Sequence, residues 1–447
     1  MSMAIPTTIN NSSSLELINF GGNQLFGGIP EAVFGLANLT TLYLNDNNLV
    51  GTISESIGQL TQLRRFVINN NQITGELPNS INNLTKLAVL NIEDNSFTGS
   101  LPDISSLAEL QILMLSNNQF SGPLPDLMSL LKLTYLELFN NQFSGTLSNP
   151  LLNTTRILAI DMKGNLFSGS IPSDFYEAQF LRALDLSNNQ FSGELQPFLS
   201  QQFNSINLSN NQFTGILDNI FLYPTPISKF ILSNNQFSGS IPDWITSNSS
   251  VLTYLDVSNN AFSGSLPSAD TFKYIQQFLI NNNSFQQSLD SIFSLFIGVE
   301  SLVTLSLNNN LLSGTIGETI NDLGGTNLYF VNISNNQISG DLPESVDFDF
   351  TVDISGNNFT CPFPETWNAN SYVTCVSNCC EITQQVTGAS SQADNNGLII
   401  GLSVAGGALL LLVVVIVIVV SVYYARRRKQ KYVILEDEFH GQESSEE

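Results

Sequence analysis

LSNNQFSG fills residues 115–122, recurs unchanged at residues 186–193 and 232–239, and returns as LSNNQFTG at residues 208–215. When these copies are aligned on their second asparagine, the same pattern continues through fifteen repeats. The reference asparagines of the repeats are Asn23, Asn47, Asn71, Asn95, Asn118, Asn141, Asn165, Asn189, Asn211, Asn235, Asn260, Asn283, Asn310, Asn336 and Asn357. Their spacing is 22 to 25 residues at first and 27, 26 and 21 residues at the last three steps. A period of this length predicts a solenoid in which each repeat forms one coil.

Each repeat has the same apolar positions around its reference asparagine. Five and three residues before it lies a pair such as Leu113 and Leu115, and this alternation predicts a short strand with one buried face. Two residues after it lies a large apolar residue, which is Phe in ten repeats. We therefore expect an aromatic column along the core of the solenoid.

The polar positions of the repeat are predicted to support the coil. The reference asparagine is expected to be buried and to bond backbone groups of its own coil and the next, because an unpaired buried polar group costs roughly 1–3 kcal/mol. The glycine that follows in thirteen repeats predicts a turn with positive φ or a close approach between coils. The serine, the first asparagine and the glutamine of LSNNQFSG are interpreted as solvent-facing filler.

The complete unit is L-x-x-L-x-x-L-x-L-x-x-N-x-L/F-x-G-x-I/L-P, and residues 60–78, LTQLRRFVINNNQITGELP, match it almost throughout. This unit resembles the plant-type leucine-rich repeats of receptor-like proteins and receptor kinases, over about four fifths of the chain. The resemblance implies an α/β-type repeat solenoid, a curved right-handed superhelix with a parallel β-sheet on its concave side. It also implies recognition of peptides or proteins by exposed surfaces.

Composition excludes several classes of function. The chain has 14 Lys and Arg against 38 Asp and Glu, a net charge of −24, which argues against nucleic acid as a partner. The one histidine, His440, lies near the C-terminus, so histidine catalysis and histidine metal sites are not expected. Carboxylates on the strands are compatible with glycoside hydrolysis, but the repeat consensus already supplies them. Without a kinase signature, P-loop or nucleotide-binding glycine motif, we expect neither enzymatic activity nor a cofactor.

The four cysteines cluster just after the last repeat. They are Cys361, Cys375, Cys379 and Cys380. Such a cluster at the end of a solenoid indicates a disulfide-stapled cap and an oxidising compartment. Three pairings are possible, and strain in a vicinal bond favours those in which Cys361 and Cys375 each bond one of the adjacent cysteines. A metal site is the alternative, but paired C-x-x-C units are absent.

A membrane span is predicted near the C-terminus. Residues 398–424 contain no charge and are long enough for roughly 40 Å of helix, against about 30 Å of hydrocarbon. The basic residues that follow are Arg426, Arg427, Arg428, Lys429 and Lys431. By the positive-inside tendency the C-terminus is cytoplasmic and the solenoid is outside. These features predict a single-pass plasma-membrane protein.

Two short patterns in this region suggest contacts with other proteins. Gly397, Gly401 and Ala405 form a small-residue face that permits close packing with a second span. Tyr432 and Leu435 bound a pattern similar to adaptor-binding endocytic signals. Both patterns also arise by chance, so the alternative for each is that it has no binding role.

The predicted organisation has five parts. Residues 1–360 form the solenoid, 361–380 the cap, 381–396 a polar stalk, 397–424 the transmembrane helix and 425–447 the cytoplasmic tail. Ile5-Pro6 lies where a preceding repeat would have its I-P pair, and no signal-peptide stretch precedes Asn23. We therefore expect an N-terminally truncated chain; a genuine short N-terminus with an unusual cap is the alternative.

Asparagine sequons accompany the repeats, although the N-x-S of the consensus creates some by chance. Besides Asn10 and Asn11, the predicted glycosylation sites are Asn38, Asn83, Asn153, Asn207, Asn248, Asn282, Asn332 and Asn358. Asn207 and Asn332 fall between buried strand positions, so they are expected to project from the concave face. Glycans there would shield the later repeats from a ligand.

Residues that depart from the repeat consensus on the concave strands are the candidates for ligand binding. They concentrate in repeats two to seven and are Tyr43, Arg65, Val67, Glu93, Ile112, Met114, Tyr135, Glu137, Phe139, Asp161 and Lys163. Exposed aromatic and aliphatic groups ringed by charges are typical of an interaction patch. Sequence drift on a surface without a ligand is the alternative. We refer to these eleven residues as the concave patch.

Together these patterns predict a cell-surface receptor-like protein. It would bind an extracellular peptide, protein or glycan and signal through a partner, such as a transmembrane co-receptor or kinase. A protein for adhesion or wall contact, without signalling, is the alternative.

Overall fold

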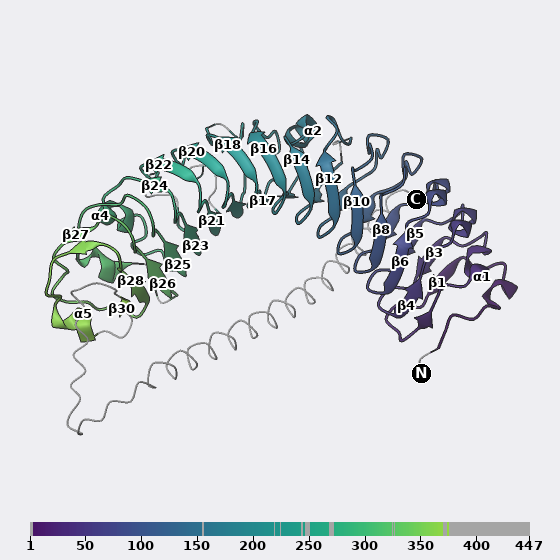
Figure 1. Cartoon of the computed structure of the whole chain (residues 1–447), viewed down its shortest axis with the longest axis horizontal. Coiled ribbons are helices and arrows are strands. Elements are labelled where there is room, and N and C mark those ends of the chain that lie inside the picture. The colour runs from purple at the N-terminus through teal and green to yellow at the C-terminus, as the bar shows by residue number, and fades with distance from the viewer. Residues whose placement is uncertain are drawn as a thin grey trace, which may run out of the picture. The chain divides into compact units, whose positions relative to one another are not determined.

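Each sequence repeat forms one coil of a parallel β-solenoid, and successive coils lie side by side along an arc (Figure 1). The computed structural model describes residues 3–374 except 154–155, 219, 224, 243–244, 246–250, 268–271, 324, 326 and 370–372. The predicted stalk, membrane span and cytoplasmic tail lie outside the described residues.

The concave side of the arc is a sixteen-stranded parallel sheet, which we call the concave sheet. Each of the fifteen repeats contributes one strand, and β30 follows them. The strands are β1 (Leu17–Asn19), β3 (Thr41–Tyr43), β5 (Arg65–Val67), β7 (Val89–Asn91), β9 (Ile112–Met114), β11 (Tyr135–Glu137), β13 (Ala159–Asp161), β15 (Ala183–Asp185), β17 (Ser205–Asn207), β19 (Lys229–Ile231), β21 (Tyr254–Asp256), β23 (Gln277–Leu279), β25 (Thr304–Ser306), β26 (Phe330–Asn332), β28 (Thr351–Asp353) and β30 (Val373–Thr374). Equivalent residues of neighbouring coils are in register, as for Leu113 and Leu136. The predicted L-x-L strands are confirmed.

A second parallel sheet of twelve strands, the flank sheet, was not predicted. It is built from the QFSG segments, whose second residue is buried while the first is exposed in most coils. The strands are β2 (Phe26–Gly27), β4 (Asn48–Gly51), β6 (Gln72–Glu76), β8 (Ser96–Gly99), β10 (Gln119–Gly122), β12 (Gln142–Thr146), β14 (Leu166–Gly169), β16 (Gln190–Glu194), β18 (Gln212–Gly215), β20 (Gln236–Gly239), β22 (Ala261–Gly264) and β24 (Ser284–Phe285). A separate pair, β27 (Ser339–Gly340) and β29 (Asn358–Phe359), follows.

The helical parts of the coils are short, so the expected α/β-type solenoid is better described as a parallel β-solenoid. The described helices have four or five residues, and the 3₁₀ turns have three to five. They are α1 (Glu31–Phe34), α2 (Ser173–Glu177), α4 (Leu289–Phe293), α5 (Glu365–Ala369), η1 (Ile9–Asn11), η2 (Glu55–Gln59), η3 (Asn79–Asn83) and η4 (Glu318–Asp322). A coil of 22 to 25 residues that already holds two strands has little length left for a longer helix.

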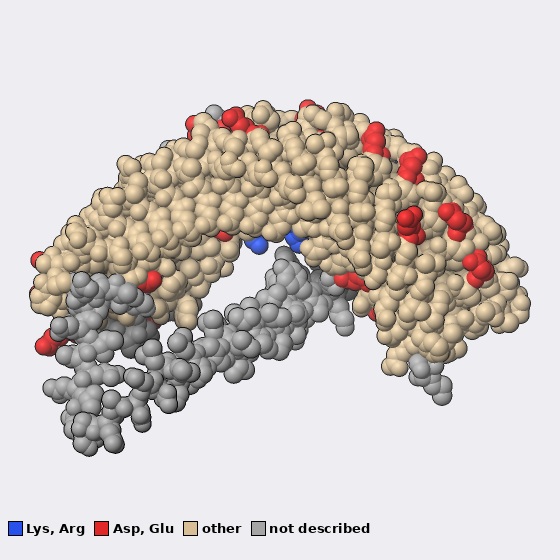
Figure 2. Space-filling model, in the orientation of Figure 1, with Lys and Arg blue, Asp and Glu red and all other residues tan. Residues whose placement is uncertain are grey.

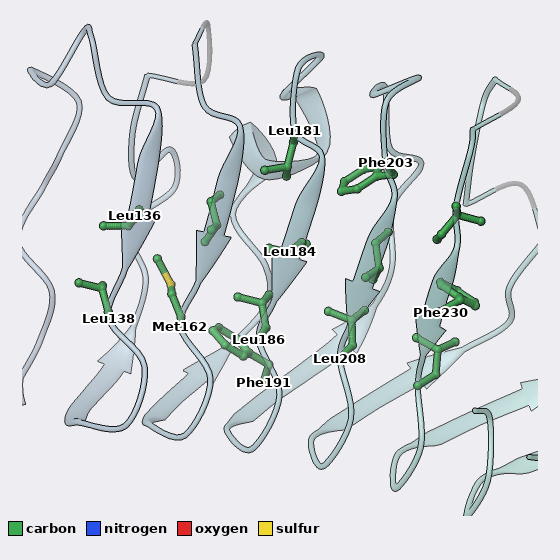
Figure 3. Close-up of a cluster of buried hydrophobic side chains, with 14 of the residues drawn as sticks. Leu136, Leu138, Met162, Leu181, Leu184, Leu186, Phe191, Phe203, Leu208 and Phe230 are labelled. Atoms are coloured by element: carbon green, nitrogen blue, oxygen red, sulfur yellow. The ribbon is translucent and has the colours of Figure 1, made fainter. Parts of the chain in front are cut away.

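The core is a set of columns in which one coil position stacks on the same position of the next. Figure 3 shows Leu138, Met162, Leu186 and Leu208 as one such column. The expected aromatic column is confirmed for nine coils, from Phe97 to Phe285, with ring centroids 5.9 to 6.4 Å apart and near-parallel planes. Offset-stacked rings at this separation attract one another beyond the burial of their apolar area.

The reference asparagines form a second column, in which each side-chain amide makes hydrogen bonds to backbone groups. Asn118 Nδ2 donates to the carbonyls of Leu115 and Ser116 in its own coil and of Ile92 in the preceding coil, at 3.0 to 3.2 Å. Its Oδ1 accepts from the Phe97 N–H at 2.9 Å.

The predicted backbone bonding is confirmed, whereas the predicted burial holds for five reference asparagines, with nine half-buried and Asn23 exposed. The partner coil is the preceding one, so the prediction of the next coil was wrong. The Ile92 carbonyl and the Phe97 N–H lie on either side of the equivalent asparagine, Asn95, in the preceding coil, where the amide of Asn118 reaches both.

Two positions of each coil have positive φ. The thirteen repeat glycines have φ between +75° and +91°, as expected for a glycine turn. The residue before each reference asparagine is also left-handed, with φ of +51° to +57° where it is Asn or Asp, and elsewhere it is Gly. These three residue types tolerate this conformation best, so the first asparagine of LSNNQFSG is required by the backbone and is not filler.

The serine of LSNNQFSG is not solvent-facing filler. Ser116 and Ser187 are fully or almost fully buried, whereas Gln119 is exposed as expected. The glutamine therefore fits the prediction, and the first asparagine faces solvent in most copies, as expected, although the backbone restricts its type.

The described part of the C-terminal cap closes the last coil. Trp367 in α5 is buried, and its Nε1 donates to the Pro343 carbonyl at 2.9 Å. Its indole meets the Phe348 ring edge to face. The strand β30 adds its backbone to β28.

Candidate ligand-binding face

The concave sheet presents three rows of side chains that the core does not use. One row comes from the middle of each L-x-L pair, a second from the residue before the pair and a third from the residue after it. Register brings equivalent residues of neighbouring coils together: Tyr135 lies beside Ile112, and Glu137 lies between Met114 and Asp161. Adjacent strands are about 4.8 Å apart, so residues in a row touch their neighbours.

All eleven residues of the concave patch fall on these three rows. Tyr43, Val67, Met114, Glu137 and Asp161 belong to the middle row, and Arg65, Ile112 and Tyr135 to the row before it. Glu93, Phe139 and Lys163 follow two residues after middle-row positions. The structure therefore places the residues of the patch side by side across β3 to β13.

The expected exposure of the patch needs correction at four positions. Val67, Ile112, Met114 and Glu137 are buried, whereas the other seven residues are half-buried. On a concave surface the side chains of adjacent strands converge, and the large neighbours Met114 and Glu137 cover one another more than the shorter Asp161 and Asp185 do.

The best-defined group in the patch joins two adjacent coils. Lys163 Nζ lies 2.9 Å from Asp161 Oδ2 and 4.2 Å from the centre of the Phe139 ring. The same lysine therefore makes an ion pair and a cation–π contact. Burial raises the pKa of Asp161 to about 6, while the charge of Lys163 acts in the opposite direction. The side chains of Asp161 and Lys163 are 23% and 33% exposed, so a ligand can reach both.

In the later coils the middle row has a structural role. Asp185 Oδ1 accepts from the backbone N–H and the hydroxyl of Ser187, at 3.0 and 2.6 Å. Asp256 bonds Ser258 in the same way, as Asn207 does Ser209. The L-D-L-S form thus ties the strand end to the turn that follows it. This explains why the carboxylates of the consensus need no ligand.

The predicted glycosylation sites lie on several surfaces. Asn207 and Asn332 are on concave strands β17 and β26, as expected. Asn38 and Asn282 use their amide nitrogens in hydrogen bonds to the Ser13 carbonyl and the Asn259 side chain. Asn83 and Asn358 are exposed, and Asn153 is half-buried. Asn248 lies outside the described residues.

Other predicted sites are described only in part. Cys361 is disulfide-bonded. The remaining cysteines and the C-terminal positions lie outside the described residues: Cys375, Cys379, Cys380, Gly397, Gly401, Ala405, Tyr432 and Leu435. Within the described ranges, no helix is both long and apolar enough to cross a membrane. The same part of the chain holds no group of three or more side chains arranged to bind a metal ion.

Comparison with known proteins gives the repeats a name. Seven segments match the family model described as Leucine Rich Repeat: residues 38–60, 62–84, 109–131, 180–201, 227–248, 251–270 and 327–348. The fold is thus a leucine-rich-repeat superhelix. A receptor protein kinase-like protein of Arabidopsis thaliana is 37% identical over 73 residues, which cover 15% of this chain and 9% of the relative.

Solved structures with the same fold include plant receptor ectodomains. The ectodomain of the membrane receptor kinase GASSHO1/SCHENGEN3 of Arabidopsis thaliana, in complex with CASPARIAN STRIP INTEGRITY FACTOR 2, has a TM-score of 0.68 and 28% identity. The match covers 84% of this chain and 49% of that chain, so this chain spans about half of that ectodomain. The Arabidopsis receptor kinase HAESA, in complex with an IDA peptide hormone ligand, has a TM-score of 0.60 and 26% identity, covering 84% and 72%.

Proposed function

We propose that this chain is a cell-surface receptor-like protein that recognises an extracellular ligand through the concave patch. The observation that carries the proposal is the gathering of non-consensus side chains on β3 to β13, where register makes one continuous face. Repeats two to seven depart most from the consensus, whereas in the later coils Asp185 and Asp256 are used by their own turns. The part of the face that departs most from scaffold chemistry is where a specific ligand is expected.

The ligand is proposed to be a peptide, with a protein or a glycan as the wider class. Two of the similar solved ectodomains are complexes, one with CASPARIAN STRIP INTEGRITY FACTOR 2 and one with an IDA peptide hormone ligand. The patch offers the aromatic ring of Phe139, the Asp161–Lys163 pair and the aromatic Tyr135 within adjacent coils. Aromatic anchors beside charged groups suit an extended peptide that lies across several strands.

The rest of the chain is proposed to place this face outside the cell. Residues 361–380 would complete a disulfide-stapled cap, 381–396 a stalk, 397–424 a membrane span and 425–447 a cytoplasmic tail. Signalling is proposed to pass through a co-receptor or kinase. Glycans at Asn207 and Asn332 would direct the ligand toward the earlier coils.

A double substitution tests the patch. Tyr135→Ala with Glu137→Ala should weaken binding of an extracellular ligand by about tenfold or more, because truncating central contact residues typically costs over 1 kcal/mol each. The matched control is Thr304→Ala with Ser306→Ala, which occupies the same two positions of β25 outside the patch. Binding of ligand candidates to cells that display the full chain provides the measurement. Equal affinity of both double variants and the wild type would remove the patch from consideration.

A second experiment separates signalling from adhesion. The full chain and a version carrying an unrelated membrane anchor are expressed in the same cells. A receptor that signals through a partner should lose its response on the foreign anchor, and a transmembrane kinase or adaptor should co-purify only with the full chain. Full function on any anchor would instead identify an adhesion or wall-contact protein.

A further inference from the structure

The positive charges of the solenoid are confined to one side of the coil. Residues 1–396 contain nine Lys and Arg: Arg64, Arg65, Lys86, Lys132, Arg156, Lys163, Arg182, Lys229 and Lys273. Each lies in a concave strand or within four residues of one; the farthest, Lys273, precedes Gln277 of β23. The described helical turns and flank strands contain several acidic residues but no Lys or Arg. In Figure 2 the visible blue side chains lie at the concave rim, whereas red ones lie both on the outer side and along that rim.

Five of these cations line the edge where the chain enters the concave strands. They are Arg64, Lys86, Lys132, Arg156 and Arg182, all exposed. Glu109 is the one acidic residue among the corresponding positions of these coils, and it pairs with Lys132 at 2.6 Å. We call these six residues the basic edge. Its net charge is positive although the whole chain is strongly negative.

Backbone hydrogen bonds make the edge continuous. The Arg64 carbonyl accepts from Ala88 N–H, and the same bond repeats through Gln111, Thr134 and Leu158 to Arg182 N–H, at 2.8 Å in each step. Five steps of strand spacing give an edge of about 24 Å. Its direction is perpendicular to the strands, so it runs along the solenoid.

Side-chain contacts show that Lys86, Lys132 and Arg182 project to the same edge. Lys86 Nζ donates to Gln62 Oε1 of the preceding coil, and Lys132 bonds Glu109 of the preceding coil. Arg182 Nε donates to Gln202 Oε1 of the following coil at 3.3 Å. Gln202 occupies the same position in its coil as Lys86 and Lys132 do in theirs. An arginine directly before a strand therefore reaches the same edge as a lysine that lies two residues earlier in its coil.

We propose that the basic edge binds an extended acidic polysaccharide whose carboxylates meet successive coils. The edge supplies nearly one cation per coil, and a polymer with one carboxylate per sugar repeats its charge in the same linear way. Guanidinium and ammonium groups both bond carboxylates, and arginine does so with two parallel hydrogen bonds. The acidic outer side does not abolish the attraction, because charges beyond about 10 Å are largely screened at 0.1 M salt.

The shape of the site favours a linear polysaccharide over other polyanions. The cations form a single file along a curved solenoid, whereas a lipid surface is flat and would meet few of them at once. Leu131 and Phe180 are exposed beside Lys132 and Arg182, but they lie two coils apart, so the edge lacks the continuous apolar surface that a folded partner would bury. This site is separate from the concave patch, so neither proposal depends on the other.

The test uses the full chain in a mild non-ionic detergent and an oligogalacturonate long enough to span the six coils of the basic edge. Affinity is measured by calorimetry at 50 and 200 mM NaCl, and it should fall on the order of 50-fold if four carboxylates release their counterions. Replacing Arg64, Lys86, Arg156 and Arg182 together by Gln should weaken binding by tenfold or more and flatten the salt dependence. Thermal unfolding of the variant checks that it remains folded.

Matched single variants sharpen the test. Lys86→Gln should weaken binding about two- to fivefold, whereas Lys229→Gln, which removes a cation from concave strand β19, should leave it unchanged. Glu109→Gln should strengthen binding because it removes the one carboxylate of the edge. The Tyr135→Ala, Glu137→Ala protein should still bind the oligogalacturonate.

Three results would overturn the proposal. The first is wild-type affinity in the fourfold variant, and the second is equal loss in Lys86→Gln and Lys229→Gln. The third is tighter binding of phosphatidylserine vesicles or polyglutamate than of oligogalacturonate, which would assign the edge to a membrane or an acidic protein.

Discussion

At the scale of single residues, the side-chain amide of the reference asparagine bonds backbone groups that a tight coil cannot pair with one another. Asn118 satisfies three carbonyls and one N–H, which belong to two coils. Strands of three residues leave these groups exposed at their ends. A side chain with two donors and an acceptor at one end can bond them all, and few other residue types offer both.

Replacement of Asn118 by alanine should therefore be costly. The change leaves three buried carbonyls and one N–H with fewer partners, so a loss of about 3 kcal/mol in the free energy of unfolding is expected. The measurement is the midpoint of urea unfolding, followed by circular dichroism. Gln119→Ala, one residue away and exposed, is the control and should change stability by no more than about 0.5 kcal/mol. Equal midpoints for the two variants would contradict the role assigned to the amide.

The sequence predicted the buried asparagine but missed its neighbour. The residue before it is Gly, Asp or Asn in all fifteen repeats, as in Gly22, Asp46 and Asn70. These types share tolerance of the left-handed conformation, so the signal was present. It was overlooked because the position is polar and exposed in several coils, which is also how filler behaves.

At the scale of elements, the concave strands were predictable and the flank strands were not. The L-x-L pair has the alternation of a half-buried strand and nothing that competes with it. The QFSG segment has one apolar residue between a polar residue and a left-handed glycine, a pattern equally typical of a turn. Its strand character comes from pairing with the coils on either side, which a single repeat cannot reveal.

The aromatic column allows a prediction about element packing. Phe143 is fully buried and stacks on Phe120 and Phe167 at 5.9 and 6.0 Å. Phe143→Ala should lower the free energy of unfolding by about 3–5 kcal/mol through the cavity that it leaves. Phe143→Leu keeps most of the volume and loses only the ring stacking, so about 1 kcal/mol is expected.

Chemical denaturation of both variants, with Gln142→Ala as an exposed control, measures these costs. A leucine variant as stable as the wild type would show that volume alone matters at this position and that ring stacking adds nothing.

At the scale of the whole molecule, each coil contacts chiefly the coils on either side of it. The stability of such an array is a sum of coil and interface terms, so damage at one end spreads only a limited distance. The cap around Trp367 is the described structure that covers the apolar end of the last coils.

Truncation of this cap should therefore act locally. Trp367→Ala is expected to speed amide hydrogen exchange in β28 and β26 by tenfold or more, because the end coils then open without the cap. Exchange in β11 should stay as in the wild type. Exchange mass spectrometry measures both regions in one sample, and Glu365→Ala in the same helix is the control. Uniform acceleration along the chain would mean that the solenoid unfolds as one cooperative unit.

Some features of the candidate ligand face could be predicted from the sequence, and others could not. Departure from consensus predicted the concave patch from the sequence, and strand register places its residues in neighbouring coils. Burial of Met114 and Glu137 depends on side chains from adjacent coils, which lie 23 residues away in sequence. The basic edge was hidden for the same reason, since its cations are spread over more than a hundred residues.

The asparagine column has a consequence for how such a chain can change in length. Each amide bonds only its own coil and the one before it. The asparagine column can therefore be extended by one coil wherever the inserted segment has the length of one repeat. A duplicated segment of 24 residues, such as 48–71, carries its own strand, amide, core side chain and glycine. The molecule can thereby lengthen its concave surface in whole steps of one strand, while every existing contact but one interface stays as it was.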